Sequence, residues 1–168
     1  MVYEKSDWDP KSFKLDEALK LAETKTAHAL NAIDPSLKPF QARGGKLILY
    51  HGWNDAAIPG TNTIDYYRSV VTKMGQTDTD SFVRLFLAPG MQHCAGGPGP
   101  SFFGQFGDAP FDDPEHNAFV ALEQWVEKGV APSQVIATKY VDDNPTPRRQ
   151  NDASPVPVPA GREVQRRR

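Results

Sequence analysis

The sequence predicts an α/β fold in which parallel strands are flanked by helices. Two short apolar runs, residues 46–50 and 82–87, have the length and the glycine or proline boundaries of buried strands. Each run is followed by a polar loop and then by a stretch with the apolar spacing of a helix. This alternation is typical of a parallel sheet, whose reactive groups lie beyond the carboxyl ends of the strands. A chain of 168 residues, 39% hydrophobic and 24% charged, suits one soluble globular domain.

A helix is expected first, over residues 14–33. Its apolar positions recur at close to 3.6 residues: Leu15, Ala18, Leu19, Ala22, Ala29 and Leu30. Asp34 precedes Pro35, and a proline pushes the residue before it out of the helical region, so the helix should end there. The first strand then follows the glycine pair at positions 44–45 and ends before Gly52.

A second helix and a second strand follow the first loop. Thr61 or Asn62 can cap a helix that runs to about Met74, and Gly75 can stop it. The second strand occupies residues 82–87. The sequence thus predicts a helical crossover between two neighbouring parallel strands.

The last part of the body should be a long loop and a third helix. Residues 91–113 are too rich in glycine, proline and phenylalanine for regular structure, so we expect a loop there. The helix should cover residues 114–128, with Pro114 in its first turn and Gly129 at its end.

Charge and hydropathy exclude two classes of partner. Six arginines against Asp152 and Glu163 give residues 144–168 a formal charge of +4, so the total of -2 leaves -6 for the body. We therefore expect no nucleic-acid site on the folded part, because phosphate binding needs clustered Lys and Arg. No apolar run approaches the roughly 20 residues of a membrane span, so no membrane is expected either.

Asp55 and His93 are the candidate catalytic residues. Asp55 follows the first strand and His93 follows the second, which is the chain order of the carboxylate and the base in α/β-hydrolases. In such a triad a neutral imidazole takes the proton of a serine hydroxyl, and a buried carboxylate orients the imidazole. Many α/β proteins place an Asp and a His after strands, so the spacing alone does not separate a triad from an incidental pair.

The neighbours of these two residues have simpler interpretations. His51 and Trp53 flank Gly52 at the strand end, where we expect support or packing rather than direct catalysis. A metal site could be considered at residues 51, 55, 93 and 94. These residues lack the ligand spacing of a zinc site, so no metal is expected. Cys94 is the one cysteine of the chain, which excludes an internal disulfide.

Three stretches of the chain resemble the tannase and feruloyl esterase family, which includes the hydrolase of mono(hydroxyethyl) terephthalate. They are GGKLILYHGWNDAAI at 44–58, RLFLAPGMQHCAGGPG at 84–99 and WVEKGVAP at 125–132. The resemblance extends over nearly all of residues 1–140, and its His-Cys pair after Pro-Gly-Met is specific.

The resemblance implies roles for individual residues. It makes Asp55 the triad carboxylate and His93 the general base, and it makes Cys94 the residue that in the family is disulfide-bonded to a cysteine beside the nucleophilic serine. This chain departs from the family, because it has no Gly-Cys-Ser-x-Gly-Gly elbow and no second cysteine. Residues 1–143 are therefore identified as the C-terminal portion of an α/β-hydrolase domain, without its lid and nucleophile elbow. Calcium, present in the lid of some relatives, is not expected here, and no other cofactor is implied.

The resemblance also implies a function and a location. The expected activity is hydrolysis of aromatic acid esters through a Ser-His-Asp triad; an inactive truncated remnant and a non-enzymatic binding module are the alternatives. The compartment is unknown from the chain, and relatives imply secretion or a periplasmic location. An exposed sheet edge should allow association.

Residues 144–168, rich in Pro and Arg, are expected to be a disordered tail. Composition alone would make this tail an arm for anionic partners. Read one base later with permitted codons, residues 151–168 give a segment similar to the family's ending, Thr-Arg-Pro-Leu-Cys-Pro-Tyr-Pro. Our hypothesis is that the tail is a functionless frameshift product.

Overall fold

A computed structural model describes residues 2–107, 111–144 and 154–159 of the chain. The chain divides into two compact units, Met1–Asp34 and a second that begins at Pro35. The portion expected to form one domain over residues 1–143 thus comprises a short N-terminal unit and a unit that holds the strands. Each is described by itself.

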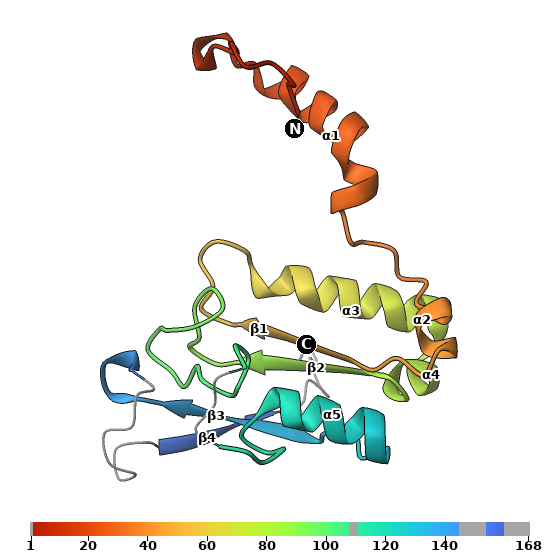
Figure 1. The fold of residues 1–168 in the computed structure, drawn as a ribbon, viewed down its shortest axis with the longest axis vertical. Coiled ribbons are helices and arrows are strands. Elements are labelled where there is room, and N and C mark those ends of the chain that lie inside the picture. Colours follow the sequence, from red (N-terminus) through yellow and green to blue (C-terminus); the bar gives the residue numbers. More distant parts are fainter. Residues whose placement is uncertain (1, 108–110, 145–153, 160–168) are drawn as a thin grey trace, which may run out of the picture. The chain divides into compact units, whose positions relative to one another are not determined.

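The first unit consists of a short 3-10 turn, Pro10–Ser12, and the helix α1, Leu15–Leu30 (Figure 1). The predicted helix is confirmed, but it ends three residues early because the backbone of Asn31 is extended (ψ 100°). No residue of α1 is buried. Its apolar stripe therefore packs into no core of its own unit.

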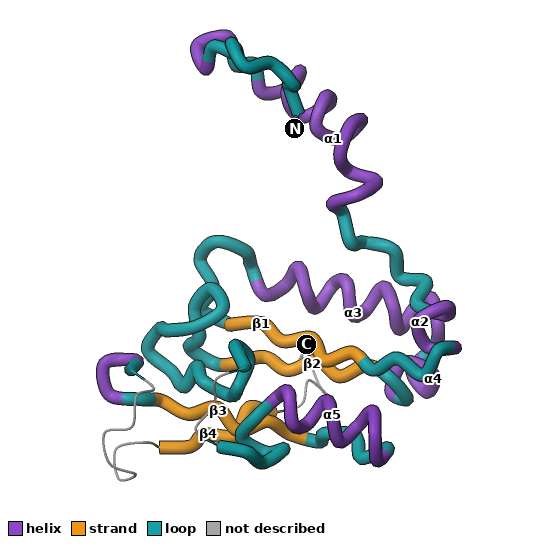
Figure 2. Tube along the Cα trace, in the orientation of Figure 1, coloured by secondary structure: helices purple, strands orange, loops and turns teal. Residues whose placement is uncertain are grey.

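The second unit is built on two parallel strands, β1 (Leu47–Gly52) and β2 (Val83–Ala88), as predicted. Their register runs from Leu47 beside Val83 to Gly52 beside Ala88. The helix α3 (Gly60–Met74) connects them, and two short helices, α2 (Lys38–Ala42) and α4 (Gln76–Asp80), lie at the opposite end of the strands from the loops after β1 and β2 (Figures 1 and 2).

Alternate residues of β1 contribute to two cores, one on each face of the sheet. Leu47 and Leu49 pack against Val70, Met74, Phe82 and Val83, the cluster under α3. Ile48 and Tyr50 pack against the other cluster, formed by Phe86, Ala88, Met91, Phe103, Val135 and Ala137. The four consecutive aliphatic or aromatic residues 47–50 suit this arrangement, because both faces of this part of the strand are covered.

The predicted starts of the second and third helices are wrong. α3 begins at Gly60 after Pro59, with no side-chain cap, so neither Thr61 nor Asn62 caps it. α5 covers Ala118–Lys128 rather than beginning at Pro114. The reason is Asn117, whose side-chain oxygen accepts the first free N–H groups of the helix. The predicted glycine ends hold, since Gly75 and Gly129 terminate α3 and α5 with positive φ angles.

A second sheet follows α5. Its strands β3 (Gln134–Lys139) and β4 (Ser154–Pro159) pair antiparallel, with a 3-10 turn at Val141–Asp143 after β3. β4 departs from the expectation of a disordered tail. Its prolines occupy every second position, which an edge strand tolerates because alternate N–H groups point away from the partner. Residues 145–153 and 160–168 of the tail lie outside the described residues.

β1 is an edge strand within the described residues. The sheet order places β2 on one side of it and no described strand on the other. Residues 47–51 are all only half-buried, whereas most of β2 is fully buried. Among the helices that the structure describes, none is both long and apolar enough to cross a membrane.

Candidate active site

The loops that follow β1 and β2 are bonded to each other through their backbones. The N–H of Trp53 donates to the carbonyl of Ala88 (3.0 Å), and the N–H of Asn54 donates to the carbonyl of Met91 (3.0 Å). At Gly52 a Cβ atom would lie 2.3 Å from the Met91 carbonyl oxygen, so only glycine lets the two loops come this close. This contact brings residues 55 and 93, far apart in sequence, to one edge of the sheet.

Asp55 and His93 form a hydrogen-bonded pair at that edge. Nδ1 of His93 lies 2.9 Å from Oδ2 of Asp55. The carboxylate is almost covered, with 4% of its side chain exposed, while 55% of the imidazole is exposed. The structure therefore brings the two predicted residues together as a shielded carboxylate and an accessible base.

The backbone of the same loop holds Asp55 ionised. Oδ1 accepts the N–H groups of Ala57 (2.8 Å) and Ile58 (3.0 Å). The Ile58 N–H is the largest contribution that lowers the pKa of Asp55, from 3.8 to about 2; burial opposes it, and the bonds from His93 and Ala57 lower the pKa further. An ionised carboxylate accepts only, so Nδ1 of His93 must carry the proton that bonds to it.

The pair can act as a proton acceptor for a third group. With Nδ1–H directed to Asp55, the free lone pair of a neutral His93 is on Nε2. Within the described residues the structure gives Nε2 no hydroxyl partner, and the ring is more than half exposed. The arrangement has the geometry of the base and carboxylate of a triad, with the position of the nucleophile open.

His51 lies against the same carboxylate. Its Nε2 is 2.9 Å from the carbonyl oxygen of Ile58 and 3.3 Å from Oδ2 of Asp55, and its Nδ1 is 2.7 Å from Oγ1 of Thr63. A carbonyl only accepts, so Nε2 carries the hydrogen and the Thr63 hydroxyl donates to Nδ1. His51 thus contacts the carboxylate of Asp55, and its supporting role stays a prediction.

Trp53 is not in the core. It is 49% exposed, and its ring lies over the first residue of α3, where a Cβ on Gly60 would be 2.9 Å from the ring. Its supporting role stays a prediction. Thr63 and the amides of residues 57–58 are site groups that sequence reasoning missed, because nothing in their residue types marks them.

Cys94 follows His93 directly and is an exposed free thiol. Its φ of 66° lies in the left-handed region, which is uncommon for a residue other than glycine. Among the described residues no group of three or more His, Cys, Asp and Glu is arranged to hold a metal ion.

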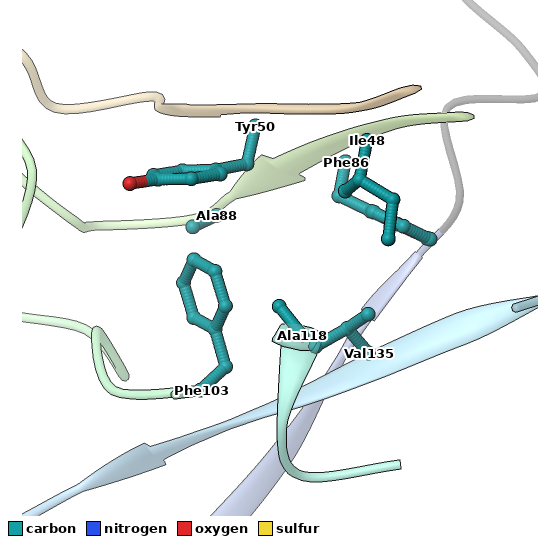
Figure 3. A pocket seen from close by; sticks show the side chains of 7 residues that line it. All are labelled: Ile48, Tyr50, Phe86, Ala88, Phe103, Ala118 and Val135. Carbon is teal, nitrogen blue, oxygen red and sulfur yellow. The ribbon is translucent and has the colours of Figure 1, made fainter. Parts of the chain in front are cut away.

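A small apolar cavity lies between the first sheet on one side and the loop after β2, the start of α5 and β3 on the other (Figure 3). It is lined by Ile48, Tyr50, Phe86, Ala88, Phe103, Ala118 and Val135. Tyr50 and Phe103 meet edge to face, with ring centroids 5.1 Å apart. Phe103 therefore anchors the histidine loop in the core.

The chain is thus an α/β protein whose parallel strands end at a paired carboxylate and imidazole. It belongs to the tannase and feruloyl esterase family, whose model matches residues 3–160. The resemblance of the three sequence stretches to this family is confirmed.

The chain is similar to proteins from Aspergillus and Xanthomonas species that are named as esterases. The chain is 40% identical over 152 residues to the protein named "Probable feruloyl esterase B-2" of Aspergillus flavus, covering 86% of this chain and 29% of the relative. It is 40% identical over 133 residues to an uncharacterised esterase of Xanthomonas campestris pv. campestris, covering 71% of this chain and 23% of the relative. The crystal structure of feruloyl esterase B from Aspergillus oryzae matches with a TM-score of 0.76 and 31% identity, over 95% of this chain and 31% of that one. The chain spans a third or less of the length of each.

Proposed function

We propose that this chain is the part of an aromatic carboxylic ester hydrolase that supplies the general base and its orienting carboxylate. The observation that carries the proposal is the 2.9 Å bond between Nδ1 of His93 and a nearly covered Asp55, with the rest of the imidazole exposed. Family membership supports an ester of an aromatic acid, such as a galloyl, feruloyl or terephthaloyl ester, as the substrate. The nucleophilic serine belongs to the region that the relatives have and this chain does not span.

The chemistry is acyl transfer through the serine. Nε2 of His93 takes the hydroxyl proton as the serine oxygen bonds to the ester carbonyl carbon, and the imidazolium returns that proton to the alcohol as its C–O bond breaks. Water then loses a proton to Nε2, its oxygen bonds to the acyl carbon, and the serine leaves with the proton. Asp55 stays ionised throughout and stabilises the imidazolium.

Cys94 has a place in this proposal. Its exposed thiol beside His93 would form a disulfide with a cysteine adjacent to the serine, the two thiols losing two protons and two electrons to a thiol-oxidising enzyme of the compartment, and this bond would fix the base relative to the nucleophile. A disulfide of this kind persists in oxidising compartments, which supports a secreted or periplasmic location. The ligand of the site is an ester substrate alone, without a cofactor.

The test is hydrolysis of methyl ferulate and methyl gallate by two polypeptides. The chain alone is expected to show no enzymatic turnover, because its sequence holds no serine elbow. A chimera in which the preceding region of the Aspergillus flavus relative is joined to this chain should cleave one of the two esters. His93→Ala in the chimera should lower kcat by about 10³-fold or more.

His116→Ala is the matched control. His116 also bonds a carboxylate, Asp113, at 2.9 Å, but outside the site, so its loss should leave kcat unchanged. Turnover that persists undiminished in the His93→Ala chimera would refute the proposed function.

A further inference from the structure

The loop that carries His93 is held by the side-chain amide of Gln105. Its Nε2 donates to the carbonyl oxygens of Ser101 (2.6 Å) and Cys94 (3.2 Å), and its Oε1 accepts the N–H of Phe103 (2.9 Å). Both N–H groups and the oxygen of the amide are therefore bonded to the backbone of one loop. The carbonyl of Cys94 is the one of the three nearest to His93 in sequence.

Two of the three groups that Gln105 bonds belong to buried residues of the unit. Ser101 is fully buried and Phe103 is 4% exposed. The N–H of Ser101 donates to the carbonyl of Thr138 in β3 (3.2 Å), which ties the loop to the second sheet. Gln105 thus connects this fixed segment to the exposed turn at residues 93–94.

The exposed turn needs such a connection. Cys94 has a left-handed backbone conformation that is unfavourable for a side chain with a Cβ, and it persists only where the surroundings impose it. The bond from Gln105 to the Cys94 carbonyl is made at that residue. A change of conformation at Cys94 would rotate the peptide next to His93 and move its ring away from Asp55.

We propose that Gln105 is a positioning residue for His93, which keeps Nδ1 directed at Asp55 by bonding the Cys94 carbonyl. The proposal rests on the proposed function, since it concerns how the base is oriented. It assigns Gln105 no contact with substrate. Neither the spacing nor the chemistry of the sequence marks this residue, because its partners are backbone groups.

The test is the tautomer of His93, read from the ¹⁵N shifts of its ring in the full chain by NMR. At a pH well above the ordinary histidine pKa of about 6.5, the wild-type ring should be protonated on Nδ1, because Asp55 accepts there. Gln105→Ala should shift the population toward the Nε2–H tautomer by more than half of the shift that Asp55→Asn causes. Gln105→Glu keeps the acceptor for Phe103 but lacks both N–H donors, so it should show the same shift.

Gln92→Ala is the matched control. It removes an exposed glutamine one residue from His93 for which the described residues provide no side-chain hydrogen bond, so the tautomer should stay that of the wild type. A wild-type tautomer in Gln105→Ala or in Gln105→Glu would overturn the inference and leave the proposed function standing. If urea melts showed that both Gln105 variants are already globally unfolded, the inference would also be overturned, because Gln105 would then stabilise the whole fold rather than position His93. An Nε2–H tautomer in the wild type would instead refute the Asp55–His93 pair, and with it the proposed function.

Discussion

At the scale of single residues, the site depends on a carboxylate that is both covered and ionised. Covering Asp55 alone would favour its protonated form, but two loop N–H groups and His93 reverse this effect. The backbone N–H groups and the imidazole thus together lower the pKa of Asp55, and the Ile58 N–H lowers it most. As a consequence, the free energy of unfolding should depend on pH in the acid range.

The first prediction concerns this acid dependence. Because the pKa of Asp55 is lowered from 3.8 to about 2 in the folded chain, its ionised form stabilises the fold above about pH 4, and the contribution disappears as the pH falls to about 2. The difference in unfolding free energy between wild type and Asp55→Asn should therefore shrink over this range in urea melts. Asp65→Asn, which alters an exposed carboxylate of α3 paired with Arg68, is the control and should show a smaller pH effect. A difference that stays constant from pH 5 to pH 2 would contradict the pKa assigned to Asp55.

At the scale of elements, α5 is placed by its first and middle residues. Asn117 caps the helix and also donates to the carbonyl of Phe111 (3.1 Å), which closes the preceding turn. Trp125 is 2% exposed and lies under the cations of Arg84 and Lys46, with the Arg84 guanidinium 4.8 Å from its ring. The helix is therefore fixed to the strands, and through Ala118 it closes the core beside Phe103.

The second prediction compares two asparagines. Asn117→Ala should lower the free energy of unfolding by about 1 kcal/mol or more, since it removes a cap and leaves the Phe111 carbonyl without its donor. Asn62→Ala should change it by less than roughly 0.5 kcal/mol, because Asn62 lies inside α3 and caps nothing. Urea unfolding followed by circular dichroism gives both values. Equal losses in the two variants would contradict the helix starts described above.

At the scale of the whole molecule, the feature with the largest consequence is the exposure of β1, the strand that leads to Asp55. The sheet order leaves one edge of β1 without a partner among the described strands, and residues 47–50 are only half-buried although they are aliphatic or aromatic. An edge of this kind pairs readily with other chains. We therefore expect the chain to associate in solution.

The third prediction is that the chain binds ANS and elutes in size-exclusion chromatography as species larger than a monomer. Leu47 and Trp53 both donate to carbonyls of the β2 side, so by the alternation of a strand the N–H of Ile48 points to the free edge. Ile48→Pro should reduce the association, whereas Leu49→Pro should disrupt the pairing with β2 and unfold the unit. A monomer that does not bind ANS would contradict this view of the edge.

Sequence patterns predicted the features that are encoded over short distances: the helix α1, the two apolar strands, their glycine boundaries, and the order of Asp55 and His93 after them. The family could also be recognised from the sequence, because its motifs are contiguous in the chain. Polar groups that act through backbone contacts left no such signal, which is why Gln105, Thr63 and the Ile58 amide were missed.

The way in which these elements meet could not be predicted from local sequence patterns. The 2.9 Å approach of His93 to Asp55 requires a parallel register, a glycine at position 52 and a loop folded back on the second sheet. The late start of α5 likewise depends on the side chain of Asn117, which caps a helix that begins four residues after the start expected at Pro114. The physical reason is the same in both cases: periodicity records which face of an element is buried, whereas distances between loops are set by packing between residues remote in the sequence.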